Sequence, residues 1–72
     1  MFKTHAGSAE LILVNSSAIR AVGYDGHTLA VQFRSSGQTY LHPGVPEGVF
    51  QDLLDASSKG SFYSKNIRGR YP

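Results

Sequence analysis

The sequence contains no cysteine, so a disulfide framework is excluded and stability has to come from packing. It also lacks an apolar run long enough to span a bilayer, because the clearest one, at residues 11–14, has only four residues. The N-terminus has neither the long apolar core nor the cleavage site of a signal peptide. Residues 1–10 have little apolar content and predict a loose leader. We therefore expect a single cytoplasmic domain over residues 11–72, with no membrane contact.

The residue patterns of common enzymes are absent as well. His5, His27 and His42 are the only histidines, and nothing in the sequence brings them together with acids as metal ligands. No serine stands in a nucleophile-elbow pattern, and the glycines form no phosphate-binding loop. We therefore predict a non-catalytic protein that holds no metal and no cofactor.

Acidic residues are missing from the last quarter of the chain, "SSKGSFYSKNIRGRYP", although the net charge of the whole chain is only +2. Four of the seven Lys and Arg residues fall in this segment, and three acids cluster just before it. Phe62, Tyr63 and Ile67 stand at near-helical spacing, which predicts that the segment is folded through Ile67. The basic segment is then either an ordinary solvated surface or a surface for an anionic partner.

The middle of the chain predicts strands. Residues 11–14 begin the ordered part, and short polar side chains at residues 15–17 can close a turn on their own backbone. Residues 19–24 and 28–33 both alternate with period two on either side of Asp25-Gly26-His27, which predicts a hairpin.

Two registers are possible for this hairpin. A two-residue Asp25-Gly26 loop would put Arg20 on the same face as Val31. A three-residue loop that includes His27 makes one face entirely apolar or small, and we favour it for that reason. In that register the pairs are Gly23 with Leu29, Ala21 with Val31, and Ile19 with Phe33.

The next turn decides which face Tyr40 occupies. A two-residue Ser36-Gly37 loop would bury Tyr40 beside Phe33. A three-residue loop over residues 35–37, with Gly37 in the left-handed conformation, would instead put Thr39 opposite Phe33 and Leu41 on the apolar face. We favour the second loop because glycine suits its third position. It places the following residues together on an open face: Arg20, Val22, Tyr24, Ala30, Gln32, Tyr40 and His42.

Residues 45–60 predict a helix. Pro46 suits the first turn, and Glu47 suits the positive end of the helix dipole. Gly60 is the expected C-terminal stop. An apolar stripe at helical spacing would cover the sheet, and it consists of Val49, Phe50, Leu53 and Leu54.

A second short helix is expected after Gly60. Ser61 can cap it, Phe62 or Tyr63 would point inward together with Ile67, and Gly69 ends it. The predicted fold class is therefore α+β: a small three- to four-stranded antiparallel β-meander with one face covered by a C-terminal helix and a second short helix.

Several of these stretches resemble a known family. The sequence from "VNSSAIRAVGYD" to "SKNIRGRY", roughly residues 14–71, is similar to the KTSC domain, a module named for the C-terminal extension of some lysyl-tRNA synthetases. This domain also occurs alone as a small bacterial or phage protein. The family has a Tyr-x-Tyr pair where this chain reads Tyr40-Leu41-His42. The resemblance rests on Ser16-Ser17, Gly23-Tyr24-Asp25, Tyr40, Val45-Pro46, Gly60 and Ile67-Arg68 before Tyr71.

The resemblance implies RNA binding, and the residue pattern suggests how. Rings two residues apart on a strand lie on one face, where successive unpaired bases can stack. Basic side chains would add a salt-dependent attraction to phosphates. The predicted nucleic-acid-binding residues are Arg20, Tyr24, Gln32, Tyr40, His42, Lys59, Lys65, Arg68 and Arg70. Two alternatives stay open: a protein-interaction or self-assembly module that forms a homodimer, and capture of a small anionic nucleotide at a dimer seam.

Overall fold

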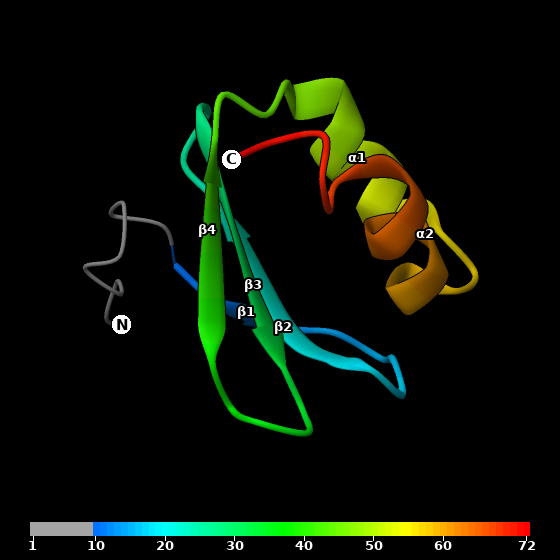
Figure 1. The fold of residues 1–72 in the computed structure, drawn as a ribbon. Coiled ribbons are helices and arrows are strands. Elements are labelled where there is room, and N and C mark those ends of the chain that lie inside the picture. The colour runs from blue at the N-terminus through cyan, green and yellow to red at the C-terminus, as the bar shows by residue number, and fades with distance from the viewer. Residues whose placement is uncertain (1–9) are drawn as a thin grey trace.

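The computed structural model describes residues 10–72, so the predicted leader lies outside the described residues apart from Glu10. A four-stranded antiparallel sheet has its strands in the order β1-β2-β3-β4, and two helices pack against one of its faces (Figure 1). The predicted α+β class and β-meander are confirmed. None of the helices within residues 10–72 is long and apolar enough to cross a membrane. The elements are β1 (Ile12–Leu13), β2 (Ile19–Tyr24), β3 (Thr28–Phe33), β4 (Thr39–Pro43), α1 (Glu47–Asp55) and α2 (Lys59–Asn66).

The turn between β1 and β2 is closed by a serine side chain, as the sequence predicts. Ser16 Oγ accepts hydrogen bonds from the backbone N–H groups of Ala18 and Ile19, each at 3.2 Å. Arg34, which follows β3, holds the same turn from the other side, because its Nε donates to the Ser16 carbonyl at 2.7 Å. The turn is thus fixed to the end of β3 by a long-range contact.

The predicted register of the first hairpin is wrong. Tyr24 pairs with Leu29 and Val22 with Val31, so the connecting loop has four residues rather than three. The cause is Asp25, whose Oδ1 accepts from the N–H groups of Thr28 at 2.7 Å and His27 at 2.9 Å. These hydrogen bonds lower the pKa of Asp25 and extend the turn by one residue. A bulge at Arg20 then restores the predicted pairing of Ile19 with Phe33.

The second hairpin also has a four-residue loop, so both registers considered for it are wrong. The Phe33 N–H donates to the Gln38 carbonyl at 3.1 Å, and the Gly37 N–H donates to the Phe33 carbonyl at 2.9 Å. Gly37 does adopt a left-handed conformation, with φ of 72°. Tyr40 therefore pairs with Val31 and shares the helix-covered face, whereas Leu41 lies on the helix-free face.

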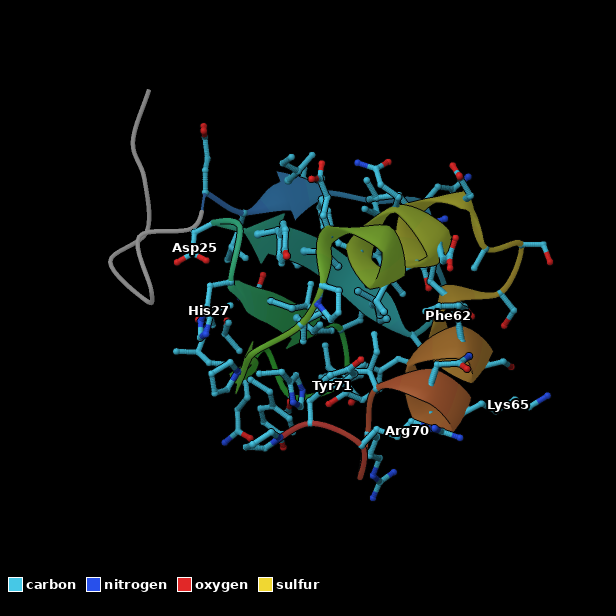
Figure 2. The ribbon with its side chains drawn as sticks, turned by 90° about the horizontal axis from the view of Figure 1, so that it is seen from above. Asp25, His27, Phe62, Lys65, Arg70 and Tyr71 are labelled. Carbon is cyan, nitrogen blue, oxygen red and sulfur yellow. The ribbon has the colours of Figure 1, made fainter. Side chains whose placement is uncertain are left out.

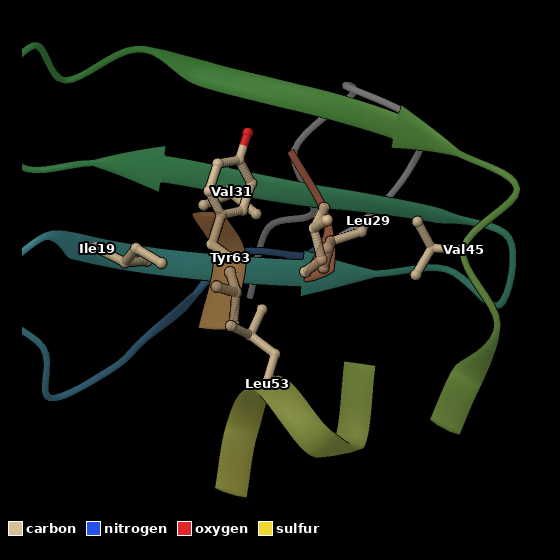
Figure 3. Packing of buried hydrophobic residues seen from close by; sticks show 8 residues of the cluster. Ile19, Leu29, Val31, Val45, Leu53 and Tyr63 are labelled. Atoms are coloured by element: carbon tan, nitrogen blue, oxygen red, sulfur yellow. The ribbon is translucent and has the colours of Figure 1, made fainter. Parts of the chain in front are cut away.

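The core lies between the sheet and the helices. Side chains of β2 and β3 meet Leu53 from α1 and Tyr63 from α2 (Figure 3). Val22, predicted for the open face, is fully buried in this cluster, while Leu53 is the most buried member of the predicted helix stripe. The cluster consists of Ile19, Val22, Leu29, Val31, Val45, Leu53, Tyr63 and Ile67.

The boundaries of the helices differ from the prediction by several residues. α1 ends at Asp55, and Gly60 lies in the first turn of α2 instead of ending α1. The cap of α2 is Ser58 rather than Ser61, because Ser58 Oγ accepts from the Ser61 N–H. Tyr63 and Ile67 point inward as expected, and Gly69, with φ of 81°, follows the helix end.

Candidate functional site

The predicted pair of stacking rings on the open face does not exist. His42 is buried on the helix-covered side, where its Nε2 meets the Tyr63 hydroxyl and its Nδ1 meets the Pro72 carbonyl, both at 2.8 Å. Tyr40 lies on the same face but remains 46% exposed, because β4 is an edge strand. Only one of the two rings is accessible to a base.

Tyr24 has a structural role instead of the predicted binding role. Its ring stacks on Phe50 from α1, with the centroids 4.9 Å apart, and its hydroxyl donates to the Val45 carbonyl. Burial raises the pKa of Tyr24, and the charges of Glu47 and Asp25 raise it further. Tyr24 therefore joins β2 to α1 through an aromatic pair, and to the segment before α1 through a hydrogen bond.

Two other predicted residues lie away from the basic segment. Arg20 is exposed at the bulge in β2. Gln32 shares the helix-free face with its pair partner Thr39, and its Nε2 donates to the Gly37 carbonyl at 3.2 Å. Within the described part of the chain, no group of three or more His, Cys, Asp or Glu side chains is placed to hold a metal ion.

Two adjoining hollows lie along α2. The first, which we term the serine hollow, has a volume of about 520 Å³ and runs between Ser16–Ala18 and the segment Ser57–Ser61. The second, the tyrosine hollow, has a volume of about 360 Å³ and lies between Tyr40 and Arg68. Phe33 and Ser64 line both hollows, so the two are direct neighbours, and we term them together the groove. No acidic side chain lines either part of it.

The walls of the serine hollow approach closely because two small residues meet. A Cβ atom on Gly60 would lie 3.0 Å from the Ala18 Cβ, so glycine at position 60 lets α2 come this near to the turn without crowding. The backbone N–H of Arg34 donates to the Ala18 carbonyl at 3.0 Å, which holds the turn next to the end of β3. The serines at residues 16–17 are thereby brought beside those at residues 57–61.

Several side chains of this hollow have hydrogen-bond donors free. Ser16 Oγ already accepts two backbone N–H groups, and a hydroxyl oxygen has two acceptor positions, so its remaining capacity is its own O–H. Ser58 Oγ likewise accepts from Ser61. Lys59 Nζ donates to the Ala56 carbonyl at 3.1 Å, which fixes the ammonium group and leaves two of its N–H groups for another acceptor. Such a set of donors suits a phosphate oxygen.

The tyrosine hollow combines an aromatic surface with a cation. The Phe33 ring contacts the rings of Tyr40 and Tyr63 edge to face, with centroid distances of 5.5 and 5.1 Å. Burial raises the pKa of the Tyr63 hydroxyl, and the positive charge of Arg68 opposes that effect. The Arg68 guanidinium thus stands next to the aromatic group, where an anion or a planar ring can meet it.

The structure brings together four of the predicted residues: Lys59, Lys65, Arg68 and Tyr40 all line the groove. Arg70 is exposed but does not line the groove. Its Nε donates to the Lys65 carbonyl at 3.4 Å. Lys65 and Arg70 both extend outward, and Lys65 lies at the opposite end of the molecule from Asp25 and His27 (Figure 2). Sequence reasoning missed the lining residues Ser16, Ser17, Phe33, Ser57, Ser58 and Ser64, whose signal is a set of serine pairs beside lysines.

Comparisons with known proteins agree with the fold. The family model of the KTSC domain matches residues 15–71. The crystal structure of a KTSC domain protein from Yersinia pestis superposes with a TM-score of 0.83 at 39% identity, covering 89% of this chain and 92% of that one. A protein from Tsukamurella paurometabola is 47% identical over 60 residues, which is 81% of this chain and 88% of the relative. An uncharacterized protein from Stutzerimonas stutzeri is 39% identical over 62 residues, which is 83% of this chain and 86% of the relative.

Proposed function

This chain belongs to the KTSC domain family, and from that premise we propose that it is a non-catalytic module that binds single-stranded RNA in the groove along α2. The proposal rests on the residues that line the two adjoining hollows, which include Lys59, Lys65, Arg68 and the exposed Tyr40. Among the described residues, no Asp or Glu lines either hollow. Proteins that bind single strands combine a positively charged groove with aromatic rings on which bases stack.

The groove differs in position from the surface that the sequence suggested. The helix-free face of the sheet offers Leu13 and Leu41, which are 70% and 41% exposed, and these side chains have no affinity for phosphate. Lys59, Lys65 and Arg68 instead lie on the helix side of the sheet, where they can act together on one backbone. The proposed setting is the cytoplasm, which fits a chain without cysteine.

The alternative is self-association through the helix-free face. It is favoured by the exposure of Leu13 and Leu41, two apolar side chains on that face. Sedimentation and RNA binding together separate the two hypotheses. A wild-type protein that is dimeric and binds no RNA, together with a monomeric Leu41→Ser variant, would favour self-association.

Fluorescence anisotropy with a labelled single-stranded RNA, measured at several salt concentrations, tests the main proposal. Each neutralised phosphate contributes about −0.7 to the slope of log K against log salt for a single strand. Replacing Lys59, Lys65 and Arg68 with glutamine should therefore make the slope shallower by about 2. The matched control is Arg20→Gln with Arg70→Gln, which removes positive charge outside the groove and should leave most of the slope intact. Absence of binding at low salt would rule out the proposed function.

A further inference from the structure

We infer that the tyrosine hollow takes one unpaired nucleobase, stacked on Tyr40, so that the ligand class is unpaired rather than double-stranded RNA. This inference rests on the proposed function and makes it more specific. Its starting point is that Tyr40 is 46% exposed although it belongs to the aromatic group of the helix-covered face.

The Tyr40 ring is held in place before any ligand arrives. Phe33 supports it edge to face at 5.5 Å, and the Tyr40 hydroxyl donates to Gln38 Oε1 at 3.2 Å. A ring fixed from two sides loses little conformational freedom when a base stacks on it. β4 is the last strand of the sheet, so no further strand of the described chain covers this ring from outside.

Polar groups around the ring suit the edges of a base. Ser36 Oγ accepts from the Gln38 N–H at 3.2 Å and keeps its own O–H to donate, while Ser35 and Ser64 line the same hollow. Arg68 lines the same hollow and brings a positive charge to it. Serine hydroxyls both donate and accept, so they can match the Watson–Crick edge of more than one base.

The hollow has room for a base, and only one ring beside it is free for stacking. Its volume of about 360 Å³ is near the lower end of the roughly 300–1,000 Å³ typical of small-ligand sites. A base within a duplex is already stacked and paired, and unstacking it costs a few kcal/mol, so a strand with free bases is preferred. His42, which would supply a second ring two residues further along, is buried against Tyr63.

The neighbouring serine hollow then holds the backbone next to this base. Phe33 and Ser64 belong to both hollows, so a base over Tyr40 leaves its adjoining phosphate facing Lys59 and Lys65. The groove therefore separates the two kinds of contact. Base stacking occurs at one end and phosphate binding at the other.

The experiment compares a short single-stranded RNA carrying one 2-aminopurine with the same RNA as a duplex. Wild-type protein should bind the single strand more tightly, and the 2-aminopurine emission should change on binding. Tyr40→Ala should weaken single-strand binding by about 5- to 140-fold, which corresponds to the roughly 1–3 kcal/mol of one stacked base, while the salt slope is preserved. Tyr40→Phe should bind like the parent. Leu41→Ala is the matched control, since Leu41 is the next residue, similarly exposed at 41%, but on the other face.

The possible outcomes separate this inference from the proposed function. If the wild-type protein binds no RNA at low salt, both fail together. If Tyr40→Ala binds as tightly as Leu41→Ala, the base site is refuted while single-strand binding in the groove stands. If the wild type binds single strand and duplex equally, both the base site and the preference for single strands are refuted, and only electrostatic RNA binding in the groove remains. The comparison of single strand with duplex uses the wild-type protein alone, so it decides the matter even if Tyr40→Ala does not fold.

Discussion

Alanine should have opposite effects at Gly48 and Gly60, although each glycine is the second residue of its helix. Replacing a helical glycine with alanine normally stabilises a protein by up to about 0.5–1 kcal/mol, because the unfolded chain loses freedom. Nothing lies within 4 Å of the position of a Cβ on Gly48, so Gly48→Ala should gain this amount. For a domain of this size that corresponds to a rise in Tm of roughly 2–8 °C.

At Gly60 the same substitution meets the turn between β1 and β2. Its Cβ would lie 3.0 Å from the Ala18 Cβ, whereas carbon atoms prefer about 3.5–4.0 Å. Overpacking of this kind costs roughly 1–3 kcal/mol, so it cancels or outweighs the helical gain. We expect Gly60→Ala to lower the free energy of unfolding by roughly 0–2 kcal/mol relative to the wild type.

A double-mutant cycle with Ala18→Gly isolates the contact. Removing the Ala18 methyl should relieve the crowding, so Ala18→Gly with Gly60→Ala should be more stable than the two single changes predict. Urea unfolding followed by circular dichroism gives the four free energies. A gain at Gly60 equal to that at Gly48, with a coupling energy below about 0.5 kcal/mol, would refute the close approach of α2 to the turn.

Two further predictions concern stability. Leu53→Ala should lower the free energy of unfolding by about 2–5 kcal/mol, because Leu53 is fully buried. Leu54 is only partly buried, so Leu54→Ala should lower Tm far less. An equal decrease in Tm for both variants would contradict the packing of α1. The pKa of Asp25 is lowered in the folded state, so its stabilising effect is present above the unfolded pKa of about 3.9 and is lost as pH falls through the lower folded value. Melts from pH 7 down to pH 2 should therefore show a smaller loss of stability in Asp25→Asn than in the wild type, and identical pH profiles would contradict the role of this carboxylate.

The sequence predicted the elements of the fold better than their register. The stripe in α1 is unambiguous, because its apolar residues recur at helical spacing beside charged ones. β2 and β3 are different, since Ala21-Val22-Gly23 and Leu29-Ala30-Val31 are apolar or small on both faces. The alternation of residues along these strands then does not show which face is buried, and the length of the connecting loop determines it. The Asp25 side chain lengthens that loop by one residue, which places Val22 in the core.

The candidate site was predictable to the extent that it depends on local composition. Lys59, Lys65 and Arg68 stand in a basic segment that is visible in the sequence, and they line the groove. Tyr40 lines the groove from the face opposite to the predicted one, because one error in a loop reverses a whole strand. The serine hollow depends on the contacts of Arg34 and Gly60 with a turn far away in the chain, and no local pattern indicates such contacts.

The meander order of the sheet has a consequence for the folding pathway. Each strand pairs with its neighbour in the chain, so the sheet can grow by closing short loops in succession, which is typical of rapid folding. The serine hollow is different, because it joins the turn that holds Ser16 to α2 at the other end of the chain. Its formation must wait until the last helix docks, and a chain that stalls with only its hairpins formed has no groove. Nascent or partly folded copies therefore lack the proposed binding groove, even where their sheet is already formed.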